Sequence, residues 1–273
     1  AALNGLVDRY KLKGEHIDEV VGGAVVTHSR DFNLTRESVL GTKLAPSTPG
    51  VTLQQACGTS LQAALGTAAK IATGEIESGI ACGSDTTSDA PIVFSKKFSK
   101  RLIELNTKKT LMDKVRVFQG LSPAELTPQP PAVKEPRTGL GMGEHCELMA
   151  QEWGITRADQ DQLAYESHTK AAAAYEQGWF DDLMVPCAGV YRDNNLRPDI
   201  TLEKLSTLKT AFDKSDKGTL TAGNSTPLTD GASAALLASE DWAKARGLLI
   251  AAYLTYGQHC GTDFAYGDGL LLA

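Results

Sequence analysis

One cysteine stands where a predicted strand turns into a predicted helix, a position at which a thiol can become a nucleophile. Cys57 lies in VTLQQACGTSLQAA (residues 51–64), where a short β-rich run precedes an alanine-rich run. A sulfur at this junction would face the unpaired N–H groups and the positive dipole end of the helix, which favour the reactive thiolate. Gly58 would let a substrate or the backbone approach closely. Because a free cysteine is more often a small buried apolar residue, position alone leaves both interpretations open.

The other titratable groups point to no second kind of site. The four remaining cysteines, Cys82, Cys146, Cys187 and Cys260, form no CxxC pair and no His/Cys grouping at metal spacing. This pattern indicates reduced thiols and argues against zinc. The net charge of −6 argues against a general nucleic-acid binder, and 42% hydrophobic with 22% charged residues is ordinary for a globular protein.

Strands and helices alternate over the first ninety or so residues. A helix is expected over residues 1–10, and buried or β-rich strands over residues 18–27, 51–55 and 78–83. Helices are expected between them, over residues 33–44 and 59–73. Strands separated by helices of this length predict parallel βαβ units.

A mostly helical insertion is predicted from Ser95 to Phe212. It opens with a basic amphipathic stretch (residues 95–114) and continues through a proline-rich connector (122–136) that should hold no regular helix or strand. Helices are expected over residues 143–153 and 157–178, the second with a capping-box start at Thr156.

The alternation of strands and helices is expected to resume near Thr219. The sequence predicts a buried strand over residues 228–239, a short helix over 240–246 and another strand over 248–256. The chain starts inside the expected first helix and ends on LLLA (residues 270–273), which suggests that both ends are truncated.

The segment around Cys57 also resembles a known nucleophile motif. QACGTSLQA (residues 55–63) is similar to the thiolase motif Cys-Ala/Gly-Ser/Thr-Gly/Ser-Leu-x-Ala. Further resemblances follow in the family's order: IACGSD (80–85), MGEHCELMA (142–150), DNNLR (193–197) and TLTAGNSTPLTDGA (219–232). Cys146-Glu147 stands where the family commonly has Ala-Glu.

The resemblance implies an α/β fold in which two βαβ-rich halves form α-β-α-β-α layers with a helical loop domain. In this sequence the parts would be residues 1–94, an N-terminal half lacking its first strand; 95–212, the loop domain; and 213–273, the start of an incomplete second half. It also implies thiolysis of a 3-ketoacyl-CoA, or the reverse Claisen condensation, through an acyl-Cys57 intermediate. Coenzyme A would be a substrate, with no cofactor and no metal.

The resemblance assigns roles to a few further residues. Met142 would line the acyl pocket, Ser225 and Thr226 would lie along the pantetheine arm, and Arg197 would approach the adenine or phosphate end of CoA. Each has an ordinary alternative, since Met is often core, Ser and Thr are common in turns, and a single Arg is usually a solvated charge. Of the histidines, only His145 is near enough to Met142 in sequence to merit a test.

The sequence of the 224–232 loop, NSTPLTDGA, resembles that of the β subunits of trifunctional β-oxidation complexes. This similarity implies a homo-oligomer, a hydratase/dehydrogenase α subunit as a possible partner, and peripheral membrane contact through residues 95–114. Docking of a partner subunit by the same stretch is an equal alternative. The compartment would be the bacterial cytoplasm or the mitochondrial matrix.

Thiolase chemistry also needs a base and a second cysteine, which the family takes from His-Glu-Ala-Phe, Gly-His-Pro and Cys-x-Gly motifs. These motifs follow the part of the family that this chain resembles, so the chain alone is expected to be inactive. The alternative is a non-catalytic thiolase-like protein that binds acyl-CoA or a subunit. A papain-like protease is excluded because Ser60-Leu61 follows where that family has Cys-Trp.

Overall fold

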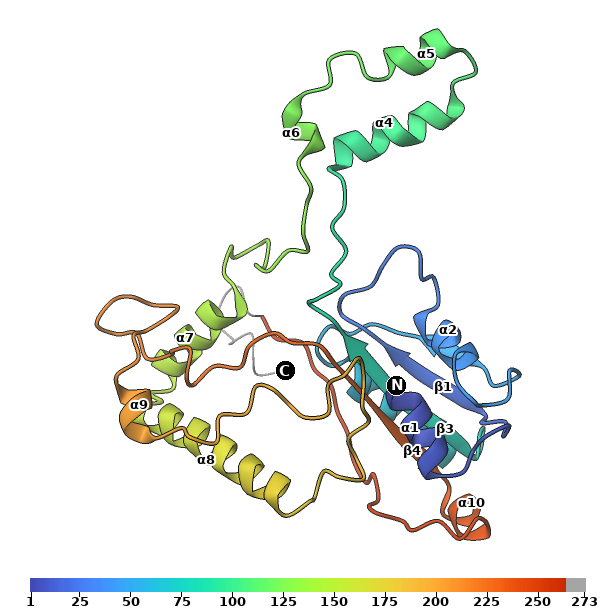
Figure 1. Cartoon of the computed structure of the whole chain (residues 1–273), viewed down its shortest axis with the longest axis vertical. Helices are drawn as coiled ribbons and strands as arrows, with labels where there is room; N and C mark the ends of the chain where they lie inside the picture. Colours follow the sequence, from blue (N-terminus) through green and yellow to red (C-terminus); the bar gives the residue numbers. More distant parts are fainter. Residues whose placement is uncertain (264–273) are drawn as a thin grey trace.

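The computed structural model describes residues 1–263 and contains one four-stranded mixed sheet (Figure 1). The strands stand in the order β2-β1-β3-β4, with bounds β1 Glu19–Gly23, β2 Gly50–Thr52, β3 Ser78–Asp85 and β4 Gly231–Ala238. β1 pairs in parallel with both β2 and β3, whereas β4 runs antiparallel to β3. The carboxyl ends of β1, β2 and β3 therefore meet at the same edge of the sheet.

Helices cover both faces of this sheet. Successive strand residues point to opposite faces. Val20 and Ile80 face a core with α1 (Ala2–Arg9), α2 (Leu34–Leu40) and α10 (Glu240–Ala245). Their neighbours Val21 and Ala81 face α3 (Thr59–Ala72) through Ala63. The sheet thus has an apolar layer on each side, as parallel sheets require.

The remaining helices form two groups outside the sheet. One group, α7 (Met142–Glu152), α8 (Arg157–Glu176) and α9 (Leu202–Ser206), lies beside the sheet in Figure 1. The other group, α4 (Lys96–Thr107), α5 (Leu111–Arg116) and α6 (Pro123–Leu126), projects away from the body. We call residues 95–127 the helical arm. Its base is closed by paired backbone hydrogen bonds between Val93 and Gln129, of 3.0 and 2.8 Å.

Most of the elements predicted from the sequence are confirmed. The three expected N-terminal strands and the helices between them are present, and the first three strands are parallel. α8 begins after Thr156 with the expected capping box, in which the Thr156 side chain accepts a hydrogen bond from the Asp159 amide. Gly178 follows the helix with φ +73°, as a helix-terminating glycine does.

Three predictions about secondary structure are wrong. The connector 122–136 contains a short helix, α6, because Pro123 stands at its first turn, where a missing N–H costs nothing. The strand predicted over residues 228–239 is present as β4, but it is largely exposed or half-buried, so its apolar composition did not indicate burial. Residues 248–256 form no regular element, although this apolar run was expected to be a strand.

Two further expectations cannot be compared directly. The apolar end at residues 270–273 lies outside the described residues. Domain boundaries at residues 94 and 212 stay predictions, although the helical elements α4 to α9 all fall between them. Within residues 1–263, no helix combines the length and the apolarity needed to cross a bilayer.

Candidate active site

Cys57 lies on a tight turn between β2 and α3. Gly58, directly after Cys57, is the N-cap of α3. Ala56, directly before Cys57, has φ +45°, a left-handed conformation that is strained for a residue with a side chain. The turn is closed by hydrogen bonds from the Gly58 amide to Gln55 O (3.0 Å) and from the Thr59 amide to Ala56 O (3.2 Å). The thiol is exposed to solvent. The sequence prediction of a cysteine at a strand-to-helix junction is confirmed.

The side chain of Thr59 fixes this turn from beneath. Its hydroxyl donates to Ala56 O at 2.7 Å and accepts from the Gln55 amide at 2.9 Å. Thr59 is buried at 4% exposure, so these bonds are shielded from competing water. The turn that presents Cys57 is therefore held by the first residue of the helix that follows it.

Close backbone approach brings the turn against the sheet. A Cβ on Gly23, at the end of β1, would lie 2.1 Å from Leu53 O. A Cβ on Gly83 in β3 would lie 2.0 Å from the Ser60 hydroxyl. Since real Cβ atoms do not come so near to a backbone oxygen, only glycine at position 23 lets the chain after β2 pack so closely on β1, whereas a side chain at position 83 would displace the Ser60 hydroxyl.

Two carboxylates tie together the loops at this edge. Asp85, the last residue of β3, accepts hydrogen bonds from the Val25 and Val26 amides, both at 2.8 Å. Asp230, just before β4, accepts from the Thr87 amide at 2.7 Å and the Ser88 amide at 3.1 Å. Hydrogen bonds from Ser88 and the Thr87 amide hold the pKa of Asp230 far below its usual range. The loop that ends at Asp230 is thus anchored to the loop that follows β3.

The predicted CoA-binding residues come from three different segments. Met142 starts α7 and is 49% exposed, while Ser225 is half-buried and Thr226 is exposed. The Arg197 guanidinium donates to two carbonyls of its own loop, Asn194 O at 2.8 Å and Leu196 O at 3.0 Å. The roles of all four residues stay predictions, and Arg197 would have to leave these carbonyls to reach a phosphate.

His145 is buried inside the helical region. Its Nε2 lies 2.9 Å from the Thr138 hydroxyl, and the residue is 5% exposed. A buried, hydrogen-bonded imidazole favours a structural role over that of a base acting on a substrate at the surface.

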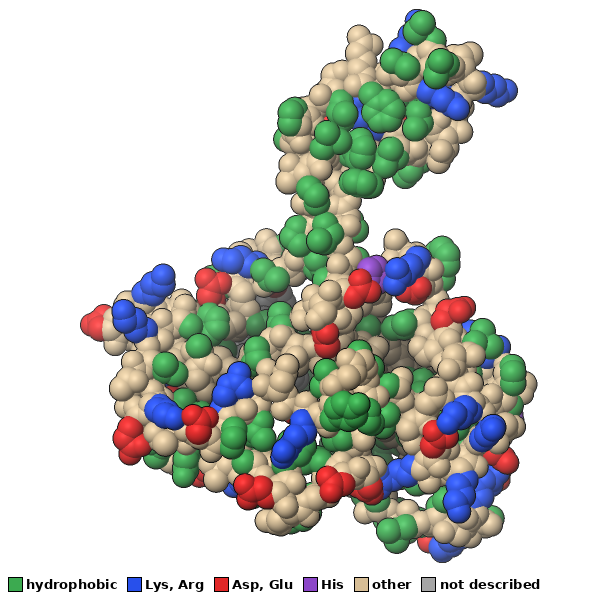
Figure 2. Space-filling model, in the orientation of Figure 1, with side chains coloured by type: hydrophobic (Ala, Val, Ile, Leu, Met, Phe, Trp, Pro, Cys, Tyr) green, Lys and Arg blue, Asp and Glu red, His purple; other side chains and the backbone are tan. Residues whose placement is uncertain are grey.

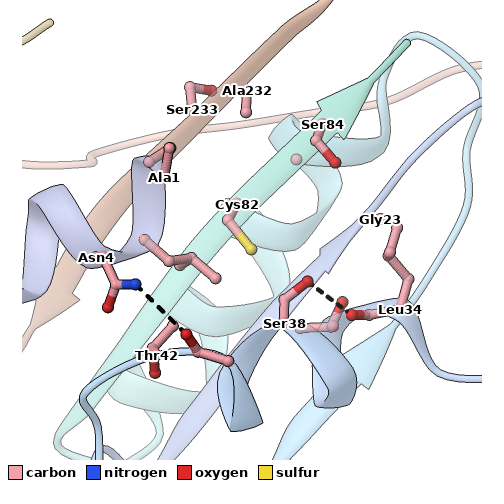
Figure 3. Close-up of a pocket in the computed structure, with 15 residues that line it drawn as sticks. Ala1, Asn4, Gly23, Leu34, Ser38, Thr42, Cys82, Ser84, Ala232 and Ser233 are labelled. Carbon is pink, nitrogen blue, oxygen red and sulfur yellow. Dashed lines mark hydrogen bonds between the residues drawn. The ribbon is translucent and has the colours of Figure 1, made fainter. Parts of the chain in front are cut away.

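Cys82 lines a cavity of about 210 Å³ between α1, α2, β3 and β4. Figure 3 shows its sulfur among residues of these elements, including Asn4, Ser38 and Ser84. Burial raises the pKa of the Cys82 thiol to about 11, so the thiol stays protonated at neutral pH and is a poor nucleophile. Because Cys57 is not among the lining residues, this cavity is separate from the candidate nucleophile.

Cys187-Ala188-Gly189 has the letters of the family's Cys-x-Gly motif. Ala188 and Gly189 both have positive φ, and Cys187 and Val190 exchange backbone hydrogen bonds of 2.9 and 3.1 Å. The tripeptide is an exposed tight turn in the helical region, and we assign it no catalytic role. Within residues 1–263, no three His, Cys, Asp or Glu side chains gather as a metal site would require.

Comparison with known proteins identifies the family. The model for the thiolase N-terminal domain matches residues 1–241. The 3-ketoacyl-CoA thiolases of Shewanella baltica and Pectobacterium atrosepticum are each 44% identical, over 258 and 255 residues. These alignments cover 92% and 91% of this chain but 59% and 58% of the relatives, so the chain spans about three fifths of their length.

Solved structures agree on the fold. Human mitochondrial 3-ketoacyl-CoA thiolase in complex with CoA superposes with a TM-score of 0.72 at 26% identity, covering 91% of this chain and 60% of that one. The acetyl-CoA acetyltransferase of Bacillus anthracis gives 0.69 at 27% identity, covering 91% and 62%. The predicted thiolase-type α/β fold is therefore confirmed, and the chain belongs to the thiolase family, whose N-terminal domain it contains.

Proposed function

We propose that this chain carries the nucleophile of a 3-ketoacyl-CoA thiolase. The Cys57 sulfur attacks the 3-keto carbonyl, the bond between C2 and C3 breaks, and acetyl-CoA leaves after its α-carbon takes a proton. The acyl group stays on Cys57 as a thioester until the thiol of a second CoA displaces it and the Cys57 sulfur regains its proton. Condensation is the same path in reverse.

The exposed position of Cys57 on the strained turn before α3 is the observation that carries this proposal. A thiol at the start of a 14-residue helix lies near backbone N–H groups that have no partner inside the helix. Such groups stabilise a thiolate and the oxyanion of a tetrahedral intermediate, and the Cys57 N–H would contribute to the second. The names of the 44% identical relatives support the same chemistry.

The substrates would be acyl-CoA and CoA, with no cofactor and no metal. Met142 would line the acyl pocket, Ser225 and Thr226 would contact pantetheine, and Arg197 would approach the phosphates. Since one solved neighbour was obtained with CoA bound, a CoA site fits the fold. The bacterial cytoplasm or the mitochondrial matrix would be the compartment, since the similar proteins come from bacteria and from human mitochondria.

We expect the chain of 273 residues to lack turnover, because it spans about 59% of its relatives and carries no His-Glu-Ala-Phe or Gly-His-Pro motif. Alkylation of the native protein by iodoacetamide, read by peptide mass, tests the site without needing turnover. We expect Cys57 and Cys187 to be modified and Cys82 to be protected. Desulfo-CoA, which has no thiol to consume the reagent, should slow modification of Cys57 alone. Equal rates for Cys57 with and without desulfo-CoA would contradict a CoA site at this edge of the sheet.

The helical arm favours a second property, contact with a membrane surface. Phe94, Ile103, Leu111, Met112 and Val115 are all more than half exposed. Figure 2 shows hydrophobic side chains gathered on the projecting arm, with Lys and Arg side chains beside them. Apolar residues interleaved with cations suit an anionic lipid surface. Sedimentation with anionic and neutral vesicles would test this, and equal binding to both, or to neither, would contradict it.

Self-association is the third part of the proposal. α3 is apolar around much of its circumference, and Leu61 on it is 60% exposed. A helix of this kind is normally covered on both sides. A homo-oligomer would cover it, and a hydratase/dehydrogenase α subunit is a further candidate partner. Sedimentation velocity of the chain would show a concentration-dependent dimer, whereas a monomer at all concentrations would contradict the homo-oligomer.

A further inference from the structure

Glu147 is a buried carboxylate whose contacts all lead to one segment or to its own helix. It lies on α7 and is 2% exposed. Its Oε1 accepts from the Thr219 amide at 2.8 Å and the Thr219 hydroxyl at 2.7 Å, and its Oε2 accepts from the Leu220 amide at 2.9 Å. Gln151, one turn along, is a weaker donor at 3.5 Å. Because both oxygens face donors, only a carboxylate satisfies every contact.

Asp161 on α8 binds the same segment at Asn224, four residues after Leu220. It is 4% exposed, and its Oδ1 accepts from the Asn224 side-chain amide at 2.9 Å. Its Oδ2 accepts from Arg157 Nε at 2.7 Å, and Arg157 also donates to Leu205 O at 2.5 Å. Asp161 is therefore itself held by a cation that is bound to α9.

The segment between the two carboxylates is folded into a closed turn. Asn224 Oδ1 accepts from the Thr221 amide at 2.7 Å, and the Thr221 hydroxyl accepts from the Gly223 amide at 3.2 Å. Thr221 has no exposed surface. The turn ends at Ser225 and Thr226, and the chain then runs to Asp230, which is anchored at the sheet edge. Residues 225–229 thus connect two residues, Asn224 and Asp230, that are each held by hydrogen bonds.

We propose that Glu147 and Asp161 are positioning residues that hold the turn 219–224 so that Ser225 and Thr226 are presented to the pantetheine arm of CoA. The inference rests on the proposed function, since it assumes that CoA binds along this stretch. Neither carboxylate touches the substrate. Each acts by removing alternative conformations of the loop, which would otherwise lower the apparent affinity by the fraction of time the loop is misplaced.

Hydrogen exchange followed by mass spectrometry tests the positioning on the chain as it is. Glu147→Gln puts an amide NH2 against one of the donors, so exchange of the Thr219 and Leu220 amides, which donate to Glu147, should rise about tenfold or more. Glu152→Gln, on an exposed position of the same helix, is the matched control and should leave exchange unchanged. Unchanged exchange in Glu147→Gln would overturn the proposal.

Exchanging the carboxylate of Asp161 with the amide of Asn224 distinguishes loss of this specific contact from general misfolding of a variant. Asp161→Asn should loosen the turn, because one acceptor is lost beside Arg157 and Asn224. The double variant Asp161→Asn/Asn224→Asp restores one donor facing one acceptor, and the new carboxylate can still accept from the Thr221 amide. We expect exchange in the double variant to return toward the wild-type rate. A double variant that exchanges faster than Asp161→Asn would contradict the assigned pairing.

Calorimetric titration with CoA separates this inference from the proposed function. We expect Glu147→Gln to weaken CoA binding about tenfold, in step with the exchange, and Glu152→Gln to leave it unchanged. If the wild-type chain binds CoA and Glu147→Gln binds it equally well, the positioning role fails alone. If the wild-type chain does not bind CoA, the proposed function fails and the positioning role with it.

Discussion

The four-stranded sheet and the helical region of residues 95–212 are stabilised by different interactions. Between the strands and α1, the contacts are apolar, and Val7, Ile17 and Ile80 have no exposed surface. In the helical region the buried side chains include Glu147 and Asp161, which are held by hydrogen bonds and an ion pair. The helical arm has one buried apolar residue, Val117, at 6% exposure. The sheet should therefore set global stability, and the helical region should set the position of loops.

Removing a core side chain from the sheet should have the largest effect on folding. Ile80→Ala deletes most of a β3 side chain that lies in the apolar core with residues of α1 and α10. This deletion should cost about 3–4 kcal/mol of unfolding free energy. Ile103→Ala on the helical arm, where the side chain is 67% exposed, should cost about 0.5 kcal/mol or less. Urea unfolding of both variants measures the contrast, and similar losses would show that the arm is packed in solution.

The half-buried thiol of Cys82 in β3 predicts a pH dependence of stability that arises in the sheet. The folded-state pKa of Cys82 is raised to about 11, so the unfolded chain releases this proton first as the pH rises. Its contribution is present below the unfolded pKa and is lost between about pH 9 and pH 11, by roughly 2 kcal/mol. Stability of the wild type minus that of Cys82→Ala should fall over this range, and a flat difference would mean that the thiol is hydrated.

The ion pair inside the helical arm should act locally. Arg101 Nε lies 2.7 Å from Glu125 Oε2, and the same guanidinium donates to Val117 O at 2.5 Å. Arg101→Lys cannot make these contacts together because it lacks the planar fork. We expect faster proteolysis within residues 95–127 and an unchanged urea midpoint for the sheet. Lys97→Ala, an exposed cation on the same helix, is the control, and a shifted urea midpoint in Arg101→Lys would show that the arm is coupled to the sheet.

The sequence predicted the sheet better than the rest because local patterns suffice there. Val20, Val21, Ile80 and Ala81 belong to short apolar runs bounded by helices, which specify buried parallel strands. The apolar run 248–256 had the same appearance but forms no strand, and pairing partners cannot be read from one segment. The direction of β4 depends in the same way on a neighbour more than a hundred residues earlier.

The candidate site was predictable at its nucleophile and less so around it. Cys57 was found because the thiolase-like motif and the strand-to-helix turn occur in one continuous segment of the sequence. Arg197 was assigned to CoA phosphates, but its loop folds so that its guanidinium reaches its own carbonyls. Glu147 and Asp161 were missed as positioning residues, since charges on helices are usually solvated. For Glu147, the only sequence signal was its place directly before the apolar run LMA (residues 148–150) in α7. For Asp161, it was the spacing of four residues from Arg157, which suits an ion pair on one helix.

Transfer of one acetyl group to Cys57 tests the central claim most directly. Thioester exchange with acetyl-CoA needs no second catalytic cysteine, because the Cys57 sulfur displaces the CoA thiolate, which takes up the proton that Cys57 loses. In mildly alkaline buffer, we expect peptide mass analysis to find one acetyl group on Cys57, removable by excess CoA and absent from Cys57→Ser. A folded wild-type protein that remains unmodified at Cys57, or that is acetylated equally at Cys187, would contradict the account.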